Sequence, residues 1–247
     1  MGKKNSRAAE KAAASKRNRI ILIVVIAIVA AAVIGALIYT LLPDRNEKPA
    51  EENKGNTNVD NTPASSDNRN YATLNVSFTD KDGNAQTGDI VIKLRPDCAP
   101  ITVANFKKLV DEKYYDGTDF FRIVDGMMIQ GGENESKSAD YIKGEFAANG
   151  VNNPLSHVRG TISMARRGSY YDGVPAYDSA SSGFFIVQQD YTYWDGQYAS
   201  FGSVVSGMEY VDMIAGTNLV YSSKYGDIVQ PQEPAVINSI TLSETLD

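Results

Sequence analysis

The sequence predicts a mainly β domain, built as a closed antiparallel barrel capped by two helices and preceded by one transmembrane helix. Three observations lead to this fold class. Residues 20–42 form one uncharged apolar run, and the segment that follows, up to residue 70, is polar almost throughout. From Tyr71 onward, short alternating segments are separated by turn signals. Many short strands with only two helices are typical of a closed antiparallel barrel.

The apolar run at residues 20–42 consists mainly of Ile, Val, Ala and Leu. At a rise of about 1.5 Å per residue it is long enough to cross a hydrocarbon core of about 30 Å with some tilt. A cleaved signal peptide is the alternative, but its apolar region usually has only about 7–15 residues and ends at a small-residue cleavage site. This run is longer, and no convincing cleavage site follows Tyr39. No Cys lies near its end, which excludes a lipoprotein. We therefore expect an uncleaved membrane anchor.

Charges on the two sides of the anchor predict its orientation. Residues 1–19 hold seven basic residues and one acid, so the positive-inside rule keeps this basic segment in the cytoplasm. Subtracting them from the 24 basic and 30 acidic residues of the chain leaves residues 43–247 with 17 and 29, a net charge of −12. This acidic part argues against nucleic acid and against an anionic membrane surface as partners. We expect a single-pass cell-membrane protein whose folded domain lies outside the cytoplasm.

Residues 43–70 predict a disordered linker, because they are rich in Asn, Glu, Lys, Pro, Ser, Thr and Asp and contain almost no large apolar residue. As a coil this segment reaches about 30 Å. Residues 71–247 form the folded domain and are numerous enough to bury a hydrophobic core. The single cysteine, Cys98, excludes an intramolecular disulfide, so the domain must be stable without one.

The elements of this domain follow from local patterns. Residues 72–78 alternate polar and apolar as a half-buried strand does, and Asp82-Gly83 marks the turn to a second strand at residues 88–94. Pro100 marks a helix start, and apolar residues recur at helical spacing up to Val110. A second short helix is predicted at residues 207–214. Further strands are predicted at residues 120–124, 127–130, 160–165, 184–187, 201–205 and 233–242.

The most informative run, residues 120–132, reads FFRIVDGMMIQGG. It resembles the signature of the cyclophilin family of peptidyl-prolyl isomerases, roughly F-H-R-x-x-x-x-F-M-x-Q-G-G. Five other segments are similar to family motifs in the same order: CAPITVANF from residue 98, YYDGTDFFR from 114, GTISMA from 160, SGFFI from 182 and DGQYASFG from 195. One such match would be weak, but six in order over one domain are specific. The resemblance implies an eight-stranded cyclophilin-like barrel and rotation of X-Pro peptide bonds.

The resemblance also implies the site residues. Arg122 would be catalytic, because a guanidinium that donates to the nitrogen of a twisted amide stabilises the twisted state alone. Gln130 would hold that guanidinium or the substrate carbonyl. Met128, Phe185 and the ring near Tyr193 would form an apolar slot for proline, while backbone groups near Ala165 and Arg166 would pin the peptide as an added strand. The substrate-binding residues would be Met127, Met128, Gln130, Ala165, Arg166, Phe185, Tyr193 and Tyr198.

Several positions depart from the family pattern. Met127 replaces a phenylalanine, Phe121 a histidine and Gly183 a glutamine, while Tyr198 in place of histidine looks like bacterial members. The tryptophan position falls at Tyr193, by an alignment that slips by one to Trp194. These changes leave open a competing function, a cyclophilin-like module that binds proline-containing segments without useful catalysis.

Other residues receive structural interpretations. His157 is the only histidine, and we interpret it as structural or surface, which leaves no His-based triad and no His metal cluster. Phe184 should face away from Phe185 and be structural. The tyrosines at positions 170, 171, 191 and 193 fit a peptide-binding rim or loop packing equally well. We expect no cofactor, a monomer, and proline-containing polypeptides as substrates during the folding of exported proteins.

Overall fold

The computed structural model describes residues 67–167 and 177–246. These residues all lie in one compact unit, Asp60–Asp247. The predicted cytoplasmic segment, the predicted membrane span at residues 20–42, most of the predicted linker and the tyrosines at positions 170 and 171 lie outside the described residues. Within the two described ranges, no helix is both long and apolar enough to cross a membrane.

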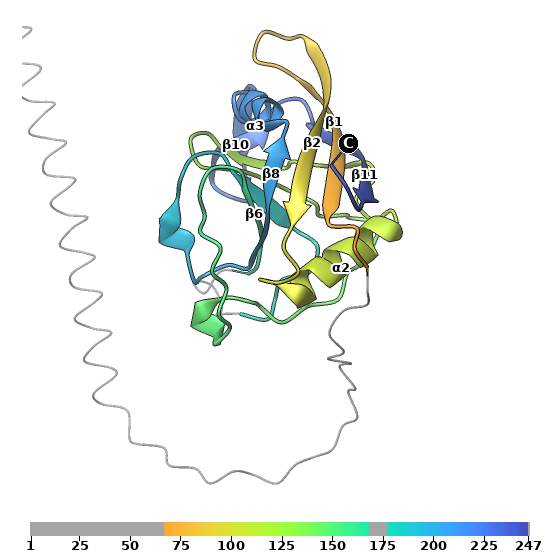
Figure 1. Cartoon of the computed structure of the whole chain (residues 1–247). Coiled ribbons are helices and arrows are strands. Elements are labelled where there is room, and N and C mark those ends of the chain that lie inside the picture. The colour runs from red at the N-terminus through yellow and green to blue at the C-terminus, as the bar shows by residue number, and fades with distance from the viewer. Residues whose placement is uncertain (1–66, 168–176, 247) are drawn as a thin grey trace, which may run out of the picture. The chain divides into compact units, whose positions relative to one another are not determined.

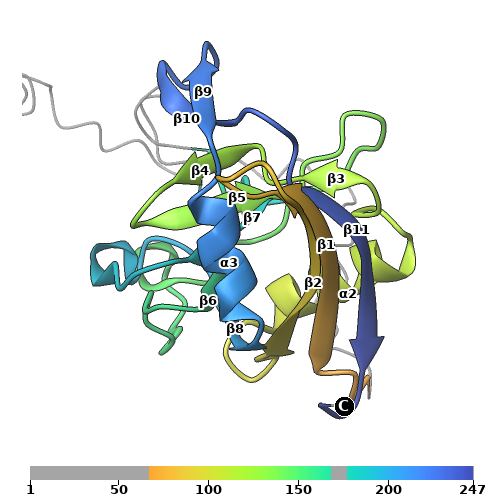
Figure 2. The ribbon, with the colours of Figure 1, turned by 90° about the horizontal axis from the view of Figure 1, so that it is seen from above.

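An antiparallel sheet of nine strands forms the body of the domain and curls into a half-barrel (Figures 1 and 2). In spatial order the strands are β3 (Thr118–Asp119), β11 (Val236–Ser243), β1 (Tyr71–Thr79), β2 (Ala85–Leu94), β8 (Ser200–Ser206), β6 (Thr161–Met164), β7 (Phe184–Val187), β5 (Met128–Gly131) and β4 (Arg122–Val124). The predicted mainly β class and the antiparallel sheet are confirmed.

One chain segment supplies both end strands of this sheet. β3 pairs with β11, β4 pairs with β5, and only Phe120 and Phe121 separate β3 from β4. The Phe120 ring is fully buried in the core while its N–H donates to the carbonyl of Ala235 (2.8 Å). The strand predicted at residues 120–124 therefore begins only at Arg122. The described sheet has nine strands in a half-barrel, where we predicted a closed barrel of eight.

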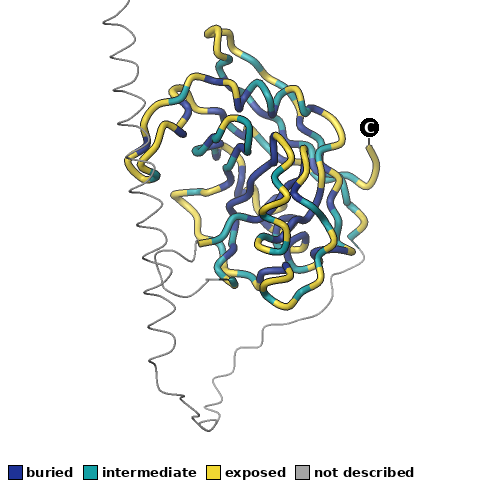
Figure 3. Tube along the Cα trace, turned by 90° about the vertical axis from the view of Figure 1, so that its left-hand side faces the viewer, coloured by how far each residue is buried: buried dark blue, intermediate teal, exposed yellow. Residues whose placement is uncertain are grey.

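Two helices, α2 (Pro100–Asp111) and α3 (Met208–Ala215), cap the curled sheet as predicted, and Figure 1 shows them toward opposite ends of its strands. β1 alternates strictly, so that Ala72, Leu74, Val76 and Phe78 all point into the core. At the centre of the core, the Phe106 ring of α2 lies 5.3 to 6.0 Å from the rings of three aromatic residues, Tyr115, Phe184 and Phe201. Figure 3 shows the buried segments gathered inside and the exposed ones at the loops.

A buried carboxylate caps α2 from a distant part of the chain. Ala99 precedes the helix and has no capping side chain. Glu145 instead accepts hydrogen bonds from the N–H groups of Ile101 (3.1 Å) and Thr102 (2.8 Å), and from the Thr102 hydroxyl (2.7 Å). A carboxylate at a helix N-terminus satisfies free N–H groups and is favoured by the helix dipole. This contact ties the segment before the short 3₁₀ helix at Ala147–Asn149 to α2.

Residues 67–70, which we expected in the disordered linker, are held against α2. The Arg69 guanidinium pairs with Asp67 (2.9 Å) and with Asp111 of α2 (2.8 Å). Lys107 donates to the carbonyl of Asp67 (2.9 Å) and to the side chain of Asn70 (3.0 Å). The hydrogen bonds from Arg69 also hold the pKa of Asp67 below its usual value. The predicted linker therefore extended a few residues too far toward the folded domain.

A β-hairpin at the edge of the domain was not predicted. β9 (Leu219–Ser222) and β10 (Asp227–Pro231) form a separate two-stranded sheet, which projects from the domain near β4 (Figure 2). Its register shifts between Ile228 and Gln230, so the sequence lacks the regular alternation that identifies strands. The turn between its strands comprises residues 223–226, and two of them, Lys224 and Tyr225, line a hollow together with Gln130.

Candidate functional site

Most of the predicted site residues lie on or beside the outer face of β4, β5 and β7. Side chains alternate between the two faces of a strand, and Ile123, Ile129 and Phe184 point into the core. Their chain neighbours therefore face the opposite side. The register places these neighbours beside one another: Arg122 opposite Gln130, Gln130 opposite Phe185, and Met128 opposite both Val124 and Val187.

A second hydrophobic cluster covers this outer face and is separated from the main core by the sheet. Met128 is 1% exposed, Phe185 5% and Val187 0%. Partly buried side chains pack on them, and these are Val124, Met127, Ala165, Tyr191, Trp194 and Tyr198. Five of the predicted substrate-binding residues, Met127, Met128, Ala165, Phe185 and Tyr198, thus lie together. The expectation that Phe184 faces the other way is confirmed.

Trp194, and not Tyr193, completes this cluster. The Tyr193 side chain is 85% exposed and points away. The Trp194 ring lies edge-on to the ring of Phe185, with a centroid separation of 5.1 Å, and 6.0 Å from that of Tyr198. Both residues belong to a 3₁₀ helix at Thr192–Trp194, in which one step along the chain turns a side chain by about 120°. The assignment of Tyr193 to the slot is therefore corrected to Trp194.

Arg122 lies at the polar edge of the cluster. Its Nη1 donates to the Gln130 amide oxygen (3.1 Å), one of the two roles expected for Gln130. Its Nε is buried and has no hydrogen-bond partner, the only such side-chain atom among the described residues. A buried donor without a partner costs about 1–3 kcal/mol. The site therefore holds one strong donor ready for an acceptor that comes from outside.

Ala165 and Arg166 lie beside the cluster at the end of β6. The N–H of Ala165 donates to the carbonyl of Gly183 (2.8 Å), so this donor already has a partner within the protein. The Arg166 guanidinium lies over the ring of Tyr198, 4.8 Å from its centroid, and its Nε donates to the carbonyl of Gln197 (2.9 Å). The side chain of Arg166 thus holds Tyr198 in place, a role beyond the backbone contact expected from the sequence.

The side chain of His157 packs against the aromatic rings of the cluster. It is fully buried, and its ring stacks on that of Phe185 with centroids 6.0 Å apart. Its Nδ1 lies 2.9 Å from Asp195 Oδ1, and its Nε2 lies 3.0 Å from Ser163 Oγ. Burial lowers the pKa of His157, opposed by the hydrogen bond to Asp195. Of the two interpretations from sequence, structural or surface, the structure supports the first.

A hollow of about 490 Å³ opens next to these residues. It is lined by Gln130, Ala165 and Arg166, by Gly183 at the position where the family has glutamine, and by Glu133, Lys224 and Tyr225. A Cβ atom at Gly183 would meet its nearest neighbours at 3.6 Å or more, so the glycine leaves space here that a larger side chain could fill. The sequence did not identify the last two of these residues, because the hairpin that carries them was not predicted.

The described part of the chain holds neither a metal-ligand cluster nor a reactive thiol. Within residues 67–167 and 177–246, no three His, Cys, Asp or Glu side chains are placed to hold a metal ion. Cys98 is buried, and burial raises the pKa of its thiol, which favours the unreactive protonated form. The site itself presents a cation, Arg122, an amide, Gln130, and an apolar cluster.

Comparisons with known proteins identify the family of this chain. A family model described as cyclophilin type peptidyl-prolyl cis-trans isomerase/CLD matches residues 78–242. The chain is 39% identical over 165 residues to peptidyl-prolyl cis-trans isomerase B of Escherichia coli (strain K12), covering 64% of this chain and 95% of that protein. It is 38% identical over 157 residues to peptidyl-prolyl cis-trans isomerase A of Dickeya dadantii (strain 3937), covering 62% and 78%.

A solved structure shares the fold. The crystal structure of a cyclophilin type peptidyl-prolyl cis-trans isomerase from Cryptosporidium parvum matches with a TM-score of 0.51 at 23% identity, covering 69% of this chain and 98% of that one. A structure of the same protein in the presence of the dipeptide Ala-Pro matches with the same TM-score, 0.51. At this level of identity the likeness supports the fold, a curled antiparallel sheet with two helices.

Replacing Trp194 by alanine is expected to weaken the binding of a proline-containing peptide at least five-fold. The loss of an aromatic neighbour of Phe185 removes about 1 kcal/mol or more from the slot. Tyr193→Ala is the matched control and should bind as the unmodified protein does, because its ring is exposed. Binding is measured by peptide titration. Equal effects of the two substitutions would contradict the assignment of Trp194 to the slot.

Lowering the pH is expected to destabilise the fold through His157. Its folded-state pKa lies below the ordinary value of 6.5. Between these two values the unfolded chain binds a proton that the folded chain does not, so the free energy of unfolding falls as the pH drops below about 6.5 and is retained above it. Urea unfolding from pH 5 to 8 measures this slope. His157→Gln, which cannot titrate, should reduce it, and an unchanged slope would contradict the assignment.

Proposed function

Because the chain belongs to the cyclophilin family of peptidyl-prolyl cis-trans isomerases, we propose that Arg122 carries its catalysis and that a membrane anchor places this activity on exported proteins. The chain is a cyclophilin-type isomerase, which the family match over residues 78–242 establishes. The roles of single residues, the anchor and the class of client protein are the parts that we propose.

The reaction is a rotation, and it requires no nucleophile. Resonance gives the amide C–N bond partial double-bond character and a rotational barrier of about 18–20 kcal/mol. At the top of the barrier the amide is twisted and its nitrogen regains a lone pair, which can accept a hydrogen bond. An enzyme accelerates the rotation if it stabilises this twisted state more than either planar isomer. A stabilisation of about 7–8 kcal/mol corresponds to an acceleration of about 10⁵–10⁶-fold.

The observation that carries the proposal is the unpartnered Nε of Arg122. A guanidinium stays protonated at any physiological pH, so it donates without first gaining a proton. Gln130 occupies Nη1 and leaves Nε buried with no acceptor. The lone pair of a twisted proline nitrogen would supply that acceptor only while the bond is rotating. The hydrogen bond thereby forms in the transition state and is absent from both ground states.

The apolar cluster next to Arg122 suits the proline ring. Met128, Phe185 and Trp194 present buried or half-buried apolar surface within one patch. His157 and the sheet support Phe185 from behind, so its ring is held in place before substrate arrives. A preformed slot reduces the entropy lost on binding. The proline ring would stay fixed there while the preceding peptide unit rotates, in a proline-containing polypeptide substrate.

The anchor is proposed from the sequence of residues 1–42. Its support is the uncharged apolar run at 20–42, the basic segment before it and the polar segment after it. An isomerase tethered in this way would meet exported chains as they emerge unfolded, when slow proline isomerisation limits their folding. This location is the reason for proposing exported proteins as clients.

Arg122→Ala is expected to lower kcat/KM for an X-Pro peptide by about 10²–10³-fold, the usual effect of removing one donor to a transition state. Arg122→Lys should recover little, because a lysine ammonium lacks the planar fork. The matched control is Arg95→Ala, which removes an exposed arginine paired with Asp97. The full chain in detergent is assayed for isomerisation. Unchanged activity in Arg122→Ala would contradict the mechanism, while peptide binding without any catalysis in the unmodified chain would favour a binding module.

Expression in a bacterial host is expected to place the full chain in the membrane fraction at its uncleaved mass. Protease added outside the cytoplasmic membrane should remove the folded domain, because the N-terminus stays inside. Deletion of residues 20–42 is the control and should leave the protein in the soluble fraction. A cleaved, soluble product outside the cytoplasm would indicate a signal peptide and contradict the anchor.

A further inference from the structure

The turn of the β9–β10 hairpin covers the proposed catalytic arginine. The ring of Tyr225 lies under the guanidinium of Arg122, whose Cζ is 5.2 Å from the ring centroid. The same ring stacks on that of Phe121, with centroids 6.4 Å apart and an angle of 13° between the planes. A cation within about 6 Å of an aromatic centroid is attracted by the ring quadrupole. Tyr225 therefore contacts two successive residues of the segment that carries the site.

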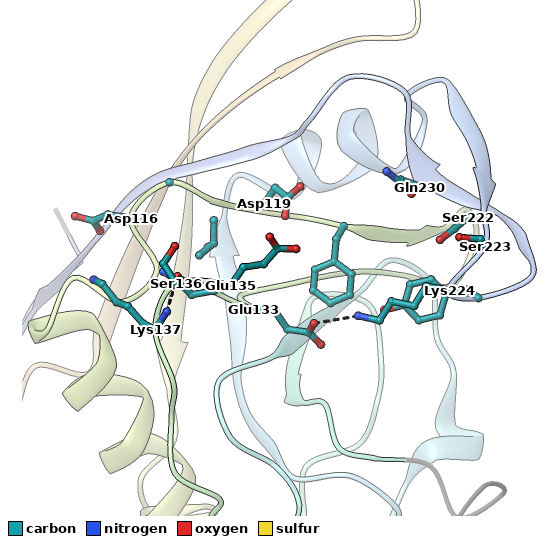
Figure 4. Close-up of a pocket in the computed structure, with 15 residues that line it drawn as sticks. Asp116, Asp119, Glu133, Glu135, Ser136, Lys137, Ser222, Ser223, Lys224 and Gln230 are labelled. Carbon is teal, nitrogen blue, oxygen red and sulfur yellow. Dashed lines mark hydrogen bonds and ion pairs between the residues drawn. The ribbon is translucent and has the colours of Figure 1, made fainter.

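A second cation, the ammonium group of Lys224, contacts the rings of both Phe121 and Tyr225. Lys224 Nζ lies 5.0 Å from the ring centroid of Phe121 and 5.3 Å from that of Tyr225. The same ammonium pairs with Glu133 Oε2 (3.1 Å), two residues after β5 (Figure 4). The hairpin turn is thus fixed both to the segment before β4 and to the segment after β5. Its position relative to Arg122 does not depend on the tyrosine alone.

Tyr225 also lies between two hollows in the surface of the domain. It lines the hollow beside Gln130 and a larger hollow of about 790 Å³ on the other side, where Lys224 and Glu133 face each other (Figure 4). The ring is partly buried. From this place it touches the arginine that borders the apolar slot without filling the slot itself. Neither the family match nor the relatives' names assign a role to it.

We propose that Tyr225 is a positioning residue for the isomerisation, which rests on the proposed role of Arg122. Its ring holds the guanidinium against Gln130, so that Nε–H keeps the direction in which it meets the twisted amide. The described contacts of Arg122 show why this is needed. A single hydrogen bond, to Gln130, fixes only one end of a long side chain that has several rotatable bonds. The flat ring under the guanidinium restricts the remaining rotation.

The residue before Arg122 fits this arrangement. The family usually has histidine there, and this chain has Phe121. The phenyl ring stacks on Tyr225 and attracts the Lys224 ammonium to its face at any pH. A histidine at this position would become positively charged near pH 6.5 and repel both Lys224 and Arg122. Phe121 and Tyr225 therefore act as one aromatic pair that keeps the hairpin next to the arginine.

Two substitutions of Tyr225 separate the effect of its aromatic face from the effect of its volume. Tyr225→Leu keeps an apolar side chain but removes the aromatic face, and it should lower kcat by about three- to ten-fold with little change in KM, since loss of a cation–π contact has effects of this order. Tyr225→Phe keeps the face and should retain full kcat. Tyr221→Ala is the control on the same hairpin, because its ring is 64% exposed.

A spectroscopic readout tests the contact between the Tyr225 ring and the Arg122 guanidinium. In the full chain, the Nε–H resonance of Arg122 should move when Tyr225→Leu removes the ring current, and Tyr225→Phe should leave it in place. An unchanged kcat in Tyr225→Leu, or an unmoved resonance, would overturn the proposal. If Arg122→Ala abolishes activity while Tyr225→Leu does not alter it, only the positioning role fails. If Arg122→Ala is also fully active, the proposed mechanism itself fails.

Discussion

The register between β4, β5 and β7 is the constraint on which the rest of this structure depends. Each of these short strands divides its side chains between two hydrophobic clusters, so that Phe184 belongs to the core and Phe185 to the slot. A slip of one residue would exchange the faces and bring Arg122 or Gln130 toward the core. Burial of Ile123, Ile129 and Phe184 opposes that slip, because each would lose about 1.5–3 kcal/mol of burial. Fold stability and site geometry thus rest on the same interactions.

Residues in segments that resemble family motifs could be predicted from the sequence, whereas those outside these segments could not. Arg122, Met128, Gln130 and Phe185 lie in such segments, and the structure places them together. Trp194 lies in a 3₁₀ turn, where a shift of one position changes which side chain faces the slot. Long-range contacts leave even less trace, since the cap that Glu145 forms on α2 joins residues more than forty positions apart.

The side chains behind the slot explain how a small exposed surface keeps one shape. Phe185 is held by the buried ring of His157, and Tyr198 by the guanidinium of Arg166. His157 in turn is oriented by Asp195, which contacts its Nδ1 and accepts a hydrogen bond from its backbone N–H (2.7 Å). Both the ring and the backbone of His157 are therefore hydrogen-bonded. Buried polar groups that are fully paired specify one arrangement and cost little, whereas partly paired ones would destabilise it. This layer of side chains therefore fixes the positions of the Phe185 and Tyr198 rings.

The partners of Arg122 differ in kind from those of Arg159. Arg159 is paired bidentately with Asp212 (2.8 and 2.6 Å), and such a carboxylate uses two of the best donors of a guanidinium. In the part of the chain that the structure describes, Arg122 has a neutral amide on one nitrogen and an aromatic ring on its face. A ring attracts the cation without accepting a hydrogen bond along its edge, so it holds the group and leaves Nε–H unused. A site that must donate only to a transient acceptor needs this combination, since a carboxylate would compete with the twisted amide throughout the reaction.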